Sequence, residues 1–262
     1  MNIALIGYGK MGKLLELRAL EQGHRITGIV EPDSSDVVSL AGSVIVKTIA
    51  ELESPDVAIE FTCPDAAVPN ILALTERKIP VIVGTTGWYD RIGEVRQAVT
   101  LADSSLLWSS NFALGVHLFY RLAGVAAKLF DPFTEYDVGG WETHHNKKTD
   151  SPSGTAKILV ERVLAEMTRK RTAVWGTLER PPAPEELHYP SLRLGSAPGT
   201  HALVFDSPAD SIELIHTARN REGLVSGALT AAEWLLRCAG PGKPAGKARP
   251  GIFSLDDMLA SA

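Results

Sequence analysis

The first half of the chain alternates short apolar runs with segments of helical periodicity. The apolar runs, many of them β-branched, predict buried strands at 2–6, 25–30, 44–46, 57–61, 81–83 and 106–108. Between them, apolar residues recur at helical spacing and predict helices at 10–21, 66–77 and 91–102. Near-continuous apolar strands separated by helices are typical of a parallel sheet that is covered on both faces. This half therefore predicts an α/β fold with a Rossmann-like doubly wound parallel sheet.

The second half follows a different pattern. A helix is predicted to run to Phe130, and strands at 136–143, 192–194, 202–206 and 212–217 follow it, the last three separated by short turns. Strands this close in sequence favour an antiparallel or mixed sheet, and so an α+β region. The proline-rich, acidic stretch 177–190 is expected to be an exposed loop, and the basic run 169–171 a solvated helix end. A last helix is predicted at 222–237.

A glycine-rich turn follows the first predicted strand and opens the first helix. Its residues are Gly7, Tyr8, Gly9, Lys10, Met11 and Gly12. In a dinucleotide-binding fingerprint such glycines allow a tight turn, close approach of a pyrophosphate and close packing of helix on strand. Glu31 ends the second strand, where an acidic side chain accepts hydrogen bonds from the adenosine ribose. The alternative is a turn that only needs a positive φ.

Two further turns lie at the carboxyl ends of predicted strands, where sheets of this kind bind their ligands. Their candidate cofactor-binding residues are Gly84, Thr85, Thr86, Ser109, Ser110, Asn111 and Phe112. Glycine lets a cofactor approach closely, and the hydroxyl and backbone groups are suited to orienting a nicotinamide ribose and carboxamide. Each turn, seen alone, is equally consistent with a simple strand-to-helix cap.

Composition narrows the class of protein. The 262 residues are 45% hydrophobic, enough for one large core or two modest ones, and the net charge of −5 argues against nucleic-acid or anionic-membrane partners. The two cysteines lie in no motif, so no disulfide framework is expected. We find neither a secretory signal nor an apolar stretch long enough to span a bilayer. The expected location is cytoplasmic.

The run from Glu142 to Ala156 carries the strongest chemical signal. His144, His145 and Lys148 bring proton-transfer groups together, because histidine titrates near neutrality and lysine carries a positive charge or a transferable proton. The turn Ser153-Gly154-Thr155 then opens a helix, whose N-terminus favours an anion. A small dicarboxylate substrate would fit this order of groups. Solvated histidines and a simple helix cap are the alternatives, and no zinc-binding spacing is present, so no metal is expected.

Taken in order, this run resembles the motif of the 4-hydroxy-tetrahydrodipicolinate reductase family, of the diaminopimelate–lysine pathway. The matching residues are Glu142, His144, His145, Lys148, Asp150, Pro152, Ser153, Gly154, Thr155 and Ala156. The resemblance covers nearly the whole chain, and Phe61 and Thr62 resemble another cofactor-side turn of the family. It implies a discontinuous dinucleotide-binding domain at 1–112 and 220–262, and a substrate-binding and tetramerisation domain at 113–219.

The resemblance also implies the chemistry. A nicotinamide cofactor would reduce a heterocyclic dicarboxylate, whose hydroxyl leaves as water, to give tetrahydrodipicolinate. His144 would be the acid/base residue and Lys148 the proton donor, while His145 would help to bind substrate. Ser153, Gly154 and Thr155 would hold a carboxylate, and the assembly would be a homotetramer.

The chain departs from the commoner family pattern at the cofactor site. The glycine loop is one residue shorter, and Glu31 is followed by Pro32 in place of a basic residue that could pair with a 2′-phosphate. We therefore expect NADH to be favoured over NADPH. Two alternatives stay open from the residues alone: another two-domain amino-acid dehydrogenase, of the aspartate or diaminopimelate type, and a non-catalytic nucleotide-sensing protein.

Overall fold

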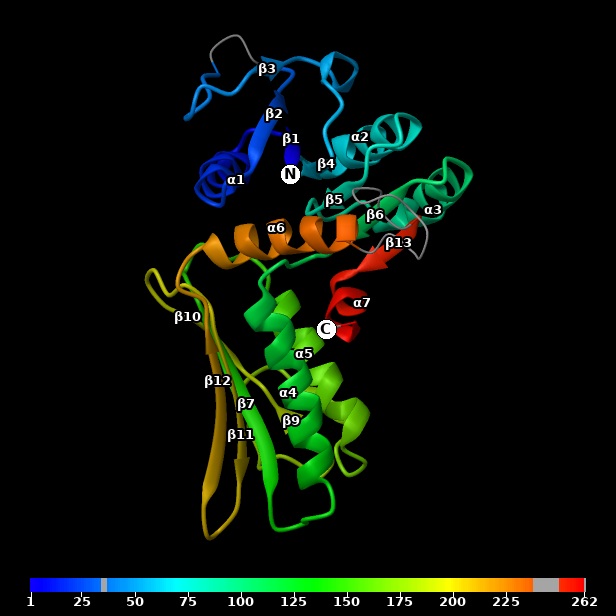
Figure 1. Cartoon of the computed structure of the whole chain (residues 1–262). Coiled ribbons are helices and arrows are strands. Elements are labelled where there is room, and N and C mark those ends of the chain that lie inside the picture. Colours follow the sequence, from blue (N-terminus) through cyan, green and yellow to red (C-terminus); the bar gives the residue numbers. More distant parts are fainter. Residues whose placement is uncertain (34–36, 238–249, 262) are drawn as a thin grey trace. The chain divides into compact units, whose positions relative to one another are not determined.

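The computed structural model describes residues 1–33, 37–237 and 250–261 (Figure 1). The chain divides into two compact units. Unit 1 comprises Met1–Ala113 and Glu222–Ala262, and unit 2 comprises Leu114–Arg221. No helix in the described ranges is both long enough and apolar enough to cross a membrane.

Unit 1 is built on a parallel sheet. Its order is β13-β6-β5-β4-β1-β2-β3, and every neighbouring pair runs parallel. The strands are β1 (Asn2–Ile6), β2 (Arg25–Val30), β3 (Ile45–Val46), β4 (Val57–Glu60), β5 (Val81–Val83), β6 (Ser105–Trp108) and β13 (Gly251–Ser254). The central strands β4 and β5 are buried along their whole length, as an apolar run between two helical layers requires. The predicted Rossmann-like sheet is confirmed.

Helices cover this sheet. They are α1 (Lys10–Glu21), α2 (Pro64–Glu76), α3 (Ile92–Leu101), α6 (Glu222–Arg237) and α7 (Leu255–Ala260), with short 3-10 turns η2 (Ile49–Glu51) and η3 (Tyr89–Arg91). Helix α1 packs on α6, and α2 packs on α3. The core between the sheet and the α2–α3 pair includes Ile71, Val83 and the fully buried Trp88. Because every strand runs the same way, their carboxyl ends lie along one edge of the sheet.

Unit 2 holds a separate mixed sheet of order β10-β7-β11-β12. Its strands are β7 (Asp137–His144), β10 (Ser191–Arg193), β11 (Thr200–Asp206) and β12 (Ser211–Thr217). Strand β10 runs parallel to β7, whereas β11 is antiparallel to both β7 and β12. Helices α4 (Leu114–Phe130) and α5 (Gly154–Glu166) pack on each other, and Phe130 stacks on Phe205 of β11 with ring centroids 4.4 Å apart.

Two expectations for unit 2 were wrong. The stretch 177–190 is not a loop throughout, because β9 (Glu186–His188) lies within it and pairs with β8 (Thr172–Val174). The basic run 169–171 is not a solvated helix end. Lys170 is only 3% exposed, and its Nζ contacts Asp137 at 2.6 Å and the carbonyl of Glu186 at 2.7 Å. Lys170 thereby joins the segment after α5 to β7 and β9, and this role requires partners far away in sequence.

Candidate functional site

The glycine turn of unit 1 leaves no room for a side chain at Gly7 or at Gly12. Gly7 has a φ of +91°, and a Cβ at this position would overlap the carbonyl oxygen of Phe61. A Cβ on Gly12 would overlap the carbonyl oxygen of Gly7, so α1 can approach the turn only because both residues are glycine. Gly9 and Lys10, at the start of α1, are exposed. The first N–H groups of this helix therefore face outward, beside the turn.

A cavity of about 350 Å³ lies beside this turn. Its lining residues are Ile6, Gly7, Tyr8, Gly9, Val30, Glu31, Pro32, Asp33, Phe61, Thr62, Cys63, Ala66 and Asn70. Glu31 accepts a hydrogen bond from the Tyr8 backbone N–H at 3.0 Å, which fixes its carboxylate against the glycine turn. The Tyr8 ring is buried, and its hydroxyl donates to the buried Glu16 carboxylate. Lys10 and Met11 do not line this cavity.

The other predicted cofactor turns meet at the same edge of the sheet. The Thr62 N–H donates to Thr85 Oγ1 at 2.7 Å, which joins the turns after β4 and β5. After β6, Ser109 Oγ donates to the carbonyl of Asn111, and the Asn111 side chain accepts from the Ala113 N–H at 2.8 Å. Exposed and partly exposed positions in these turns include Gly84, Thr86 and Ser110, whereas Phe112 is buried.

Glu60 lies beneath these turns at the end of β4 and is fully buried. Its Oε1 accepts a hydrogen bond from the Thr62 hydroxyl, while its Oε2 has no hydrogen-bond partner in the described part of the chain. Burial raises the pKa of Glu60, and hydrogen bonds from Thr62 and Thr85 offset this only in part. Glu60 therefore takes up a proton at a higher pH than an ordinary glutamate does.

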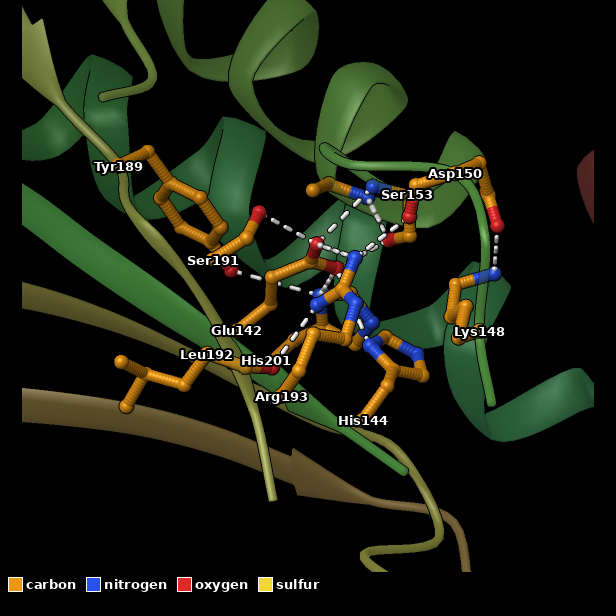
Figure 2. Close-up of polar contacts among 11 residues, drawn as sticks. Glu142, His144, Lys148, Asp150, Ser153, Tyr189, Ser191, Leu192, Arg193 and His201 are labelled. Carbon is orange, nitrogen blue, oxygen red and sulfur yellow. Dashed lines mark hydrogen bonds and ion pairs between the residues drawn. The ribbon is translucent and has the colours of Figure 1, made fainter. Parts of the chain in front are cut away.

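Unit 2 centres on a second buried carboxylate, Glu142, near the end of β7 (Figure 2). Its Oε1 accepts from the Ser153 N–H at 2.9 Å and from the Ser191 hydroxyl at 2.6 Å, and it lies 3.3 Å from Arg193. Its Oε2 accepts from the Ser153 hydroxyl. Burial alone would raise the pKa of Glu142, but the bonds from Ser153 and Ser191, with the nearby His144, hold it below its ordinary value.

Two histidines lie next to this carboxylate. His144 Nδ1 is 3.3 Å from Glu142 Oε2, and the His201 ring packs edge-on against the His144 ring with centroids 5.2 Å apart. Burial lowers the pKa of His144, an effect that Glu142 opposes and Lys148 adds to. Burial lowers the pKa of His201 to about 4. Both rings are therefore neutral near neutral pH.

Lys148 and His145 are the more accessible members of the predicted site. Lys148 is partly exposed, and its Nζ pairs with Asp150 at 2.7 Å. This contact holds the pKa of Asp150 below its usual range, so the pair is ionised. His145 is exposed and makes no side-chain hydrogen bond among the residues described. Figure 2 shows Lys148 and Asp150 together at the edge of the Glu142 cluster.

The predicted anion-binding turn begins α5. Ser153 is its N-cap, with the side chain accepting from the Ala156 N–H at 3.1 Å. Since the Ser153 N–H and hydroxyl already bond Glu142, the open donors are the backbone N–H groups of Gly154 and Thr155, which have no intrahelical acceptor at this position. Gly154 is exposed and Thr155 is partly exposed. Of the predicted turn, these two residues are the ones available to an anion.

Glu142, His144 and His201 place one potential metal-binding atom each within 4.8 Å of one another. The Glu142 oxygens, however, already accept hydrogen bonds from both serines, and the positive Arg193 and Lys148 lie close by. A divalent cation would have to displace these bonds and meet like charge. The bonds around Glu142 therefore suit a hydrogen-bonded cluster better than a metal site.

Sequence reasoning missed part of this cluster. Ser191, Arg193 and His201 come from β10 and β11, and they reach Glu142 only because these strands flank β7. One signal was present: His144 directly follows the predicted strand 136–143, two residues after Glu142, so the two side chains share a face once the strand continues to His144. A buried carboxylate on such a face needs donors from neighbouring strands.

Comparison with known proteins decides the family. Family models described as the N-terminus and the C-terminus of dihydrodipicolinate reductase match residues 1–112 and 115–259. The chain belongs to the dihydrodipicolinate reductase family. This confirms the resemblance that the histidine run suggested, and the amino-acid dehydrogenase alternative receives no comparable support.

Relatives within the family match over nearly the full length. The chain is 35% identical over 260 residues to the 4-hydroxy-tetrahydrodipicolinate reductase of Christiangramia forsetii, which covers 99% of this chain and 98% of the relative. It is 34% identical over 238 residues to that of Staphylococcus carnosus, covering 90% and 94%. A dipicolinate-bound dihydrodipicolinate reductase from Paenisporosarcina sp. TG-14 has the same fold, with a TM-score of 0.76, 19% identity and 98% coverage of both chains.

Proposed function

We propose that this family member is the NAD(P)H-dependent reductase that converts 4-hydroxy-tetrahydrodipicolinate to tetrahydrodipicolinate, with release of water, in diaminopimelate and lysine biosynthesis. The observation that carries the proposal is the cluster around Glu142. It places the acid/base candidate His144, the cation Lys148 and the anion-binding start of α5 in one unit. Unit 1 then serves as the dinucleotide-binding domain and unit 2 as the substrate-binding domain, and a purely nucleotide-sensing role would not need the unit 2 cluster.

The residues of unit 1 fit a nicotinamide dinucleotide. The glycine turn would cradle the pyrophosphate at the start of α1, and Glu31 would accept hydrogen bonds from the adenosine ribose. Thr62, Thr85 and the 109–112 turn would orient the nicotinamide half. The carboxylates of Glu31 and Asp33 line the cavity, and among the described residues no lysine or arginine lines it. This lining favours NADH over NADPH, because a 2′-phosphate would meet like charge.

The residues of unit 2 fit a small dicarboxylate. One carboxylate would bind the backbone N–H groups of Gly154 and Thr155, where the α5 dipole favours negative charge. Lys148 and His145 are accessible and would contribute charge and hydrogen bonds, while Ser153 would act by fixing the turn. A crystal soaked with dipicolinate should show a carboxylate within hydrogen-bonding distance of these N–H groups. Binding elsewhere, with the turn empty, would contradict this placement.

The proposed chemistry assigns protons to particular atoms. The bound cofactor supplies a hydride to the ring. His144, neutral near neutral pH, accepts a ring proton at Nε2 and later returns it to the ring, while Lys148 Nζ gives a proton to the departing hydroxyl, which leaves as water. The net reaction takes up one hydride and one proton and releases one water, and solvent restores the Lys148 proton.

Unit 2 also carries the surface on which we base a homotetramer. Leu118, Leu122, Val125 and Leu129 are exposed at helical spacing on α4. On the edge strand β12, Ile215 is also exposed. A row of exposed apolar residues such as the one on α4 is typical of interfaces between subunits. Light scattering should give a mass near four times that of the 28.1 kDa chain. A mass equal to one chain would contradict the assembly.

The activity is tested by a coupled assay with freshly generated pathway substrate and each cofactor. Oxidation of NADH and of NADPH is followed with the two cofactors at equal concentrations. In separate reactions, aspartate and diaminopimelate are tested as substrates by following the reduction of the oxidised cofactors. We expect turnover with the heterocyclic substrate and higher kcat/KM with NADH. Turnover with the amino acids alone would overturn the proposal.

A further inference from the structure

We propose that Glu142 is a positioning residue that holds the His144 ring in one tautomer and ties it to the anion-binding start of α5. This inference rests on the proposed reductase function, because it assigns a role to a neighbour of the acid/base residue. Glu142 is buried and does not face outward itself. It would act on the reaction through His144 and through the α5 turn.

Strand pairing places Glu142 at the centre of a row of polar residues. In the sheet of unit 2, Ser191 of β10 pairs with Glu142 on one side and His201 of β11 pairs with it on the other. His144 lies two residues further along β7, so its side chain emerges on the same face as Glu142. The carboxylate is thus surrounded by donors that the sheet holds in fixed register (Figure 2).

The carboxylate is fixed and charged. Each oxygen of Glu142 accepts at least one hydrogen bond, from Ser153 and Ser191 on one side and from the Ser153 hydroxyl on the other. Arg193 lies 3.3 Å from Oε1 and also donates to the carbonyl of Asp150 at 2.5 Å. A buried carboxylate with this many donors stays ionised and cannot rotate without breaking several bonds.

An ionised acceptor determines which His144 nitrogen carries the proton. His144 Nδ1 is buried and makes no hydrogen bond within the described part of the chain, and Glu142 Oε2 lies 3.3 Å from it. A small ring rotation would complete an Nδ1–H···Oε2 bond, which fixes the proton on Nδ1 and leaves Nε2 as the free base. The charged and titratable groups facing His144 are Glu142 from β7, Lys148 and Asp150 from the following loop, Arg193 from β10 and His201 from β11.

Gly199 keeps the other side of the ring open. Its φ is +114°, and a Cβ at this position would lie 3.1 Å from His144 Nε2. A side chain here would therefore crowd the nitrogen that has to meet the substrate. Gly199 thus leaves His144 Nε2 open, while the neutral His201 ring packs against the His144 ring.

The same carboxylate connects His144 to the anion site. Glu142 binds both the N–H and the hydroxyl of Ser153, the N-cap of α5, so the position of Gly154 and Thr155 depends on it. Movement of the α5 turn would shift Glu142 and, through it, the His144 ring. Glu142 therefore fixes the position of the His144 ring relative to the α5 turn.

The experiment compares the wild type with Glu142→Gln, Glu142→Asp and the matched control Glu161→Gln, an exposed glutamate on α5. Carbethoxylation of His144 by diethylpyrocarbonate is followed by peptide mass spectrometry against pH, which reports the His144 pKa without turnover. We expect its midpoint to shift to lower pH in Glu142→Gln, because a negative charge that favours the imidazolium is lost. It should return toward wild type in Glu142→Asp and stay unchanged in Glu161→Gln.

In the coupled assay, Glu142→Gln should lower kcat by about 10²-fold with the Kd for NADH unchanged, and Glu142→Asp should recover part of that loss. Glu142→Gln also removes hydrogen bonds that hold the structure, so its effects could be structural. Neutron diffraction of the deuterated wild type tests the tautomer without any variant. It should show the deuteron on His144 Nδ1 at a pH above the ordinary histidine pKa. A deuteron on Nε2 alone, or an unchanged midpoint in a folded Glu142→Gln protein, overturns the inference. Absence of reductase turnover in the wild type would instead refute the proposed function. The carbethoxylation midpoint and the deuteron position would still test the role of Glu142.

Discussion

Glu60 in unit 1 and Glu142 in unit 2 are both fully buried, yet their environments move their pKa values in opposite directions. Both lose the hydration that stabilises a carboxylate. Glu60 has one oxygen without a hydrogen-bond partner among the residues described, whereas Glu142 has donors on both oxygens, a nearby guanidinium and two histidines. Burial disfavours the charged form of both acids, and around Glu142 the number and charge of the donors outweigh this effect.

The contrast corresponds to two tasks. Glu60 lies beneath the cofactor turns, where burial weakens its hold on a negative charge and a dinucleotide with its own phosphates is expected. A charged Glu142 holds a histidine and a helix start in place and offsets the positive charge of Arg193. Each of the following experiments separates the two units or the two carboxylates.

The largest expected effect separates the units. Lys148→Ala should lower kcat by about 10²–10⁴-fold, because a positioned proton donor typically contributes that much. The Kd for NADH, measured by fluorescence titration, should stay within about twofold of wild type, because the cofactor residues lie in unit 1. His144→Ala should show the same separation, with a smaller loss wherever water replaces the ring. Turnover like the wild type in both variants would remove the proton-transfer assignment.

The second effect concerns stability. Glu142→Gln should destabilise unit 2 by about 3–5 kcal/mol, because it breaks a buried charged network from one side. Glu60→Gln should cost unit 1 about 1 kcal/mol, the scale of one hydrogen bond, because Glu60 has no partner of opposite charge among the residues described. Hydrogen exchange of peptides spanning β7 and β4 reports each unit separately. Equal losses in the two variants would mean that the charged partners of Glu142 add nothing to its contribution.

The third effect is the pH dependence of these losses. Because the pKa of Glu142 is depressed below 4.5, its contribution to stability is present above that pH and is lost as the pH falls. Because the pKa of Glu60 is raised above 4.5, its contribution is present at lower pH and is lost as the pH rises through the raised value. Urea denaturation of each glutamine variant against wild type, across this range, should give differences of opposite slope. Slopes of the same sign would contradict the comparison.

The smallest effect is cofactor preference. NADH should bind about tenfold more tightly than NADPH, the scale of one partly screened charge at Glu31, or about 1.4 kcal/mol. Glu31→Gln should reduce this ratio, with Glu21→Gln, an exposed glutamate at the end of α1, as the control. Fluorescence titrations at low and moderate salt would measure both. Tighter binding of NADPH by the wild type at both salt concentrations would show that Lys10 or Lys13 controls the pocket instead.

Sequence patterns located most of the fold because the strong elements are local. Strand β5 was predicted at its observed residues, since a continuous apolar run between helices has few other structures available. Strand β9 was missed because only Leu187 of its three residues is buried, and its pairing with β8 brings together residues distant in sequence. Lys170 was misjudged for the same reason, since its partners Asp137 and Glu186 lie elsewhere in the chain.

The site divides in the same way. His144, Lys148 and the α5 turn could be proposed from the sequence because they lie within one short run. Ser191, Arg193 and His201 act on that run only through strand pairing, which sequence periodicity does not specify. The distinction between Glu60 and Glu142 was also out of reach, because it depends on donors gathered from several elements.

Strand β13 has a consequence for how the protein is made. It adds the edge strand beside β6, so the sheet that starts with β1 near the first residue is finished by residues near the last. Unit 2, in contrast, is one continuous segment from Leu114 to Arg221. A ribosome synthesises the whole of unit 2 before it reaches α6 and β13. The β6 edge of unit 1 therefore stays unpaired until β13 has been made and has joined the sheet, and an open strand edge of this kind can pair with other chains in the meantime.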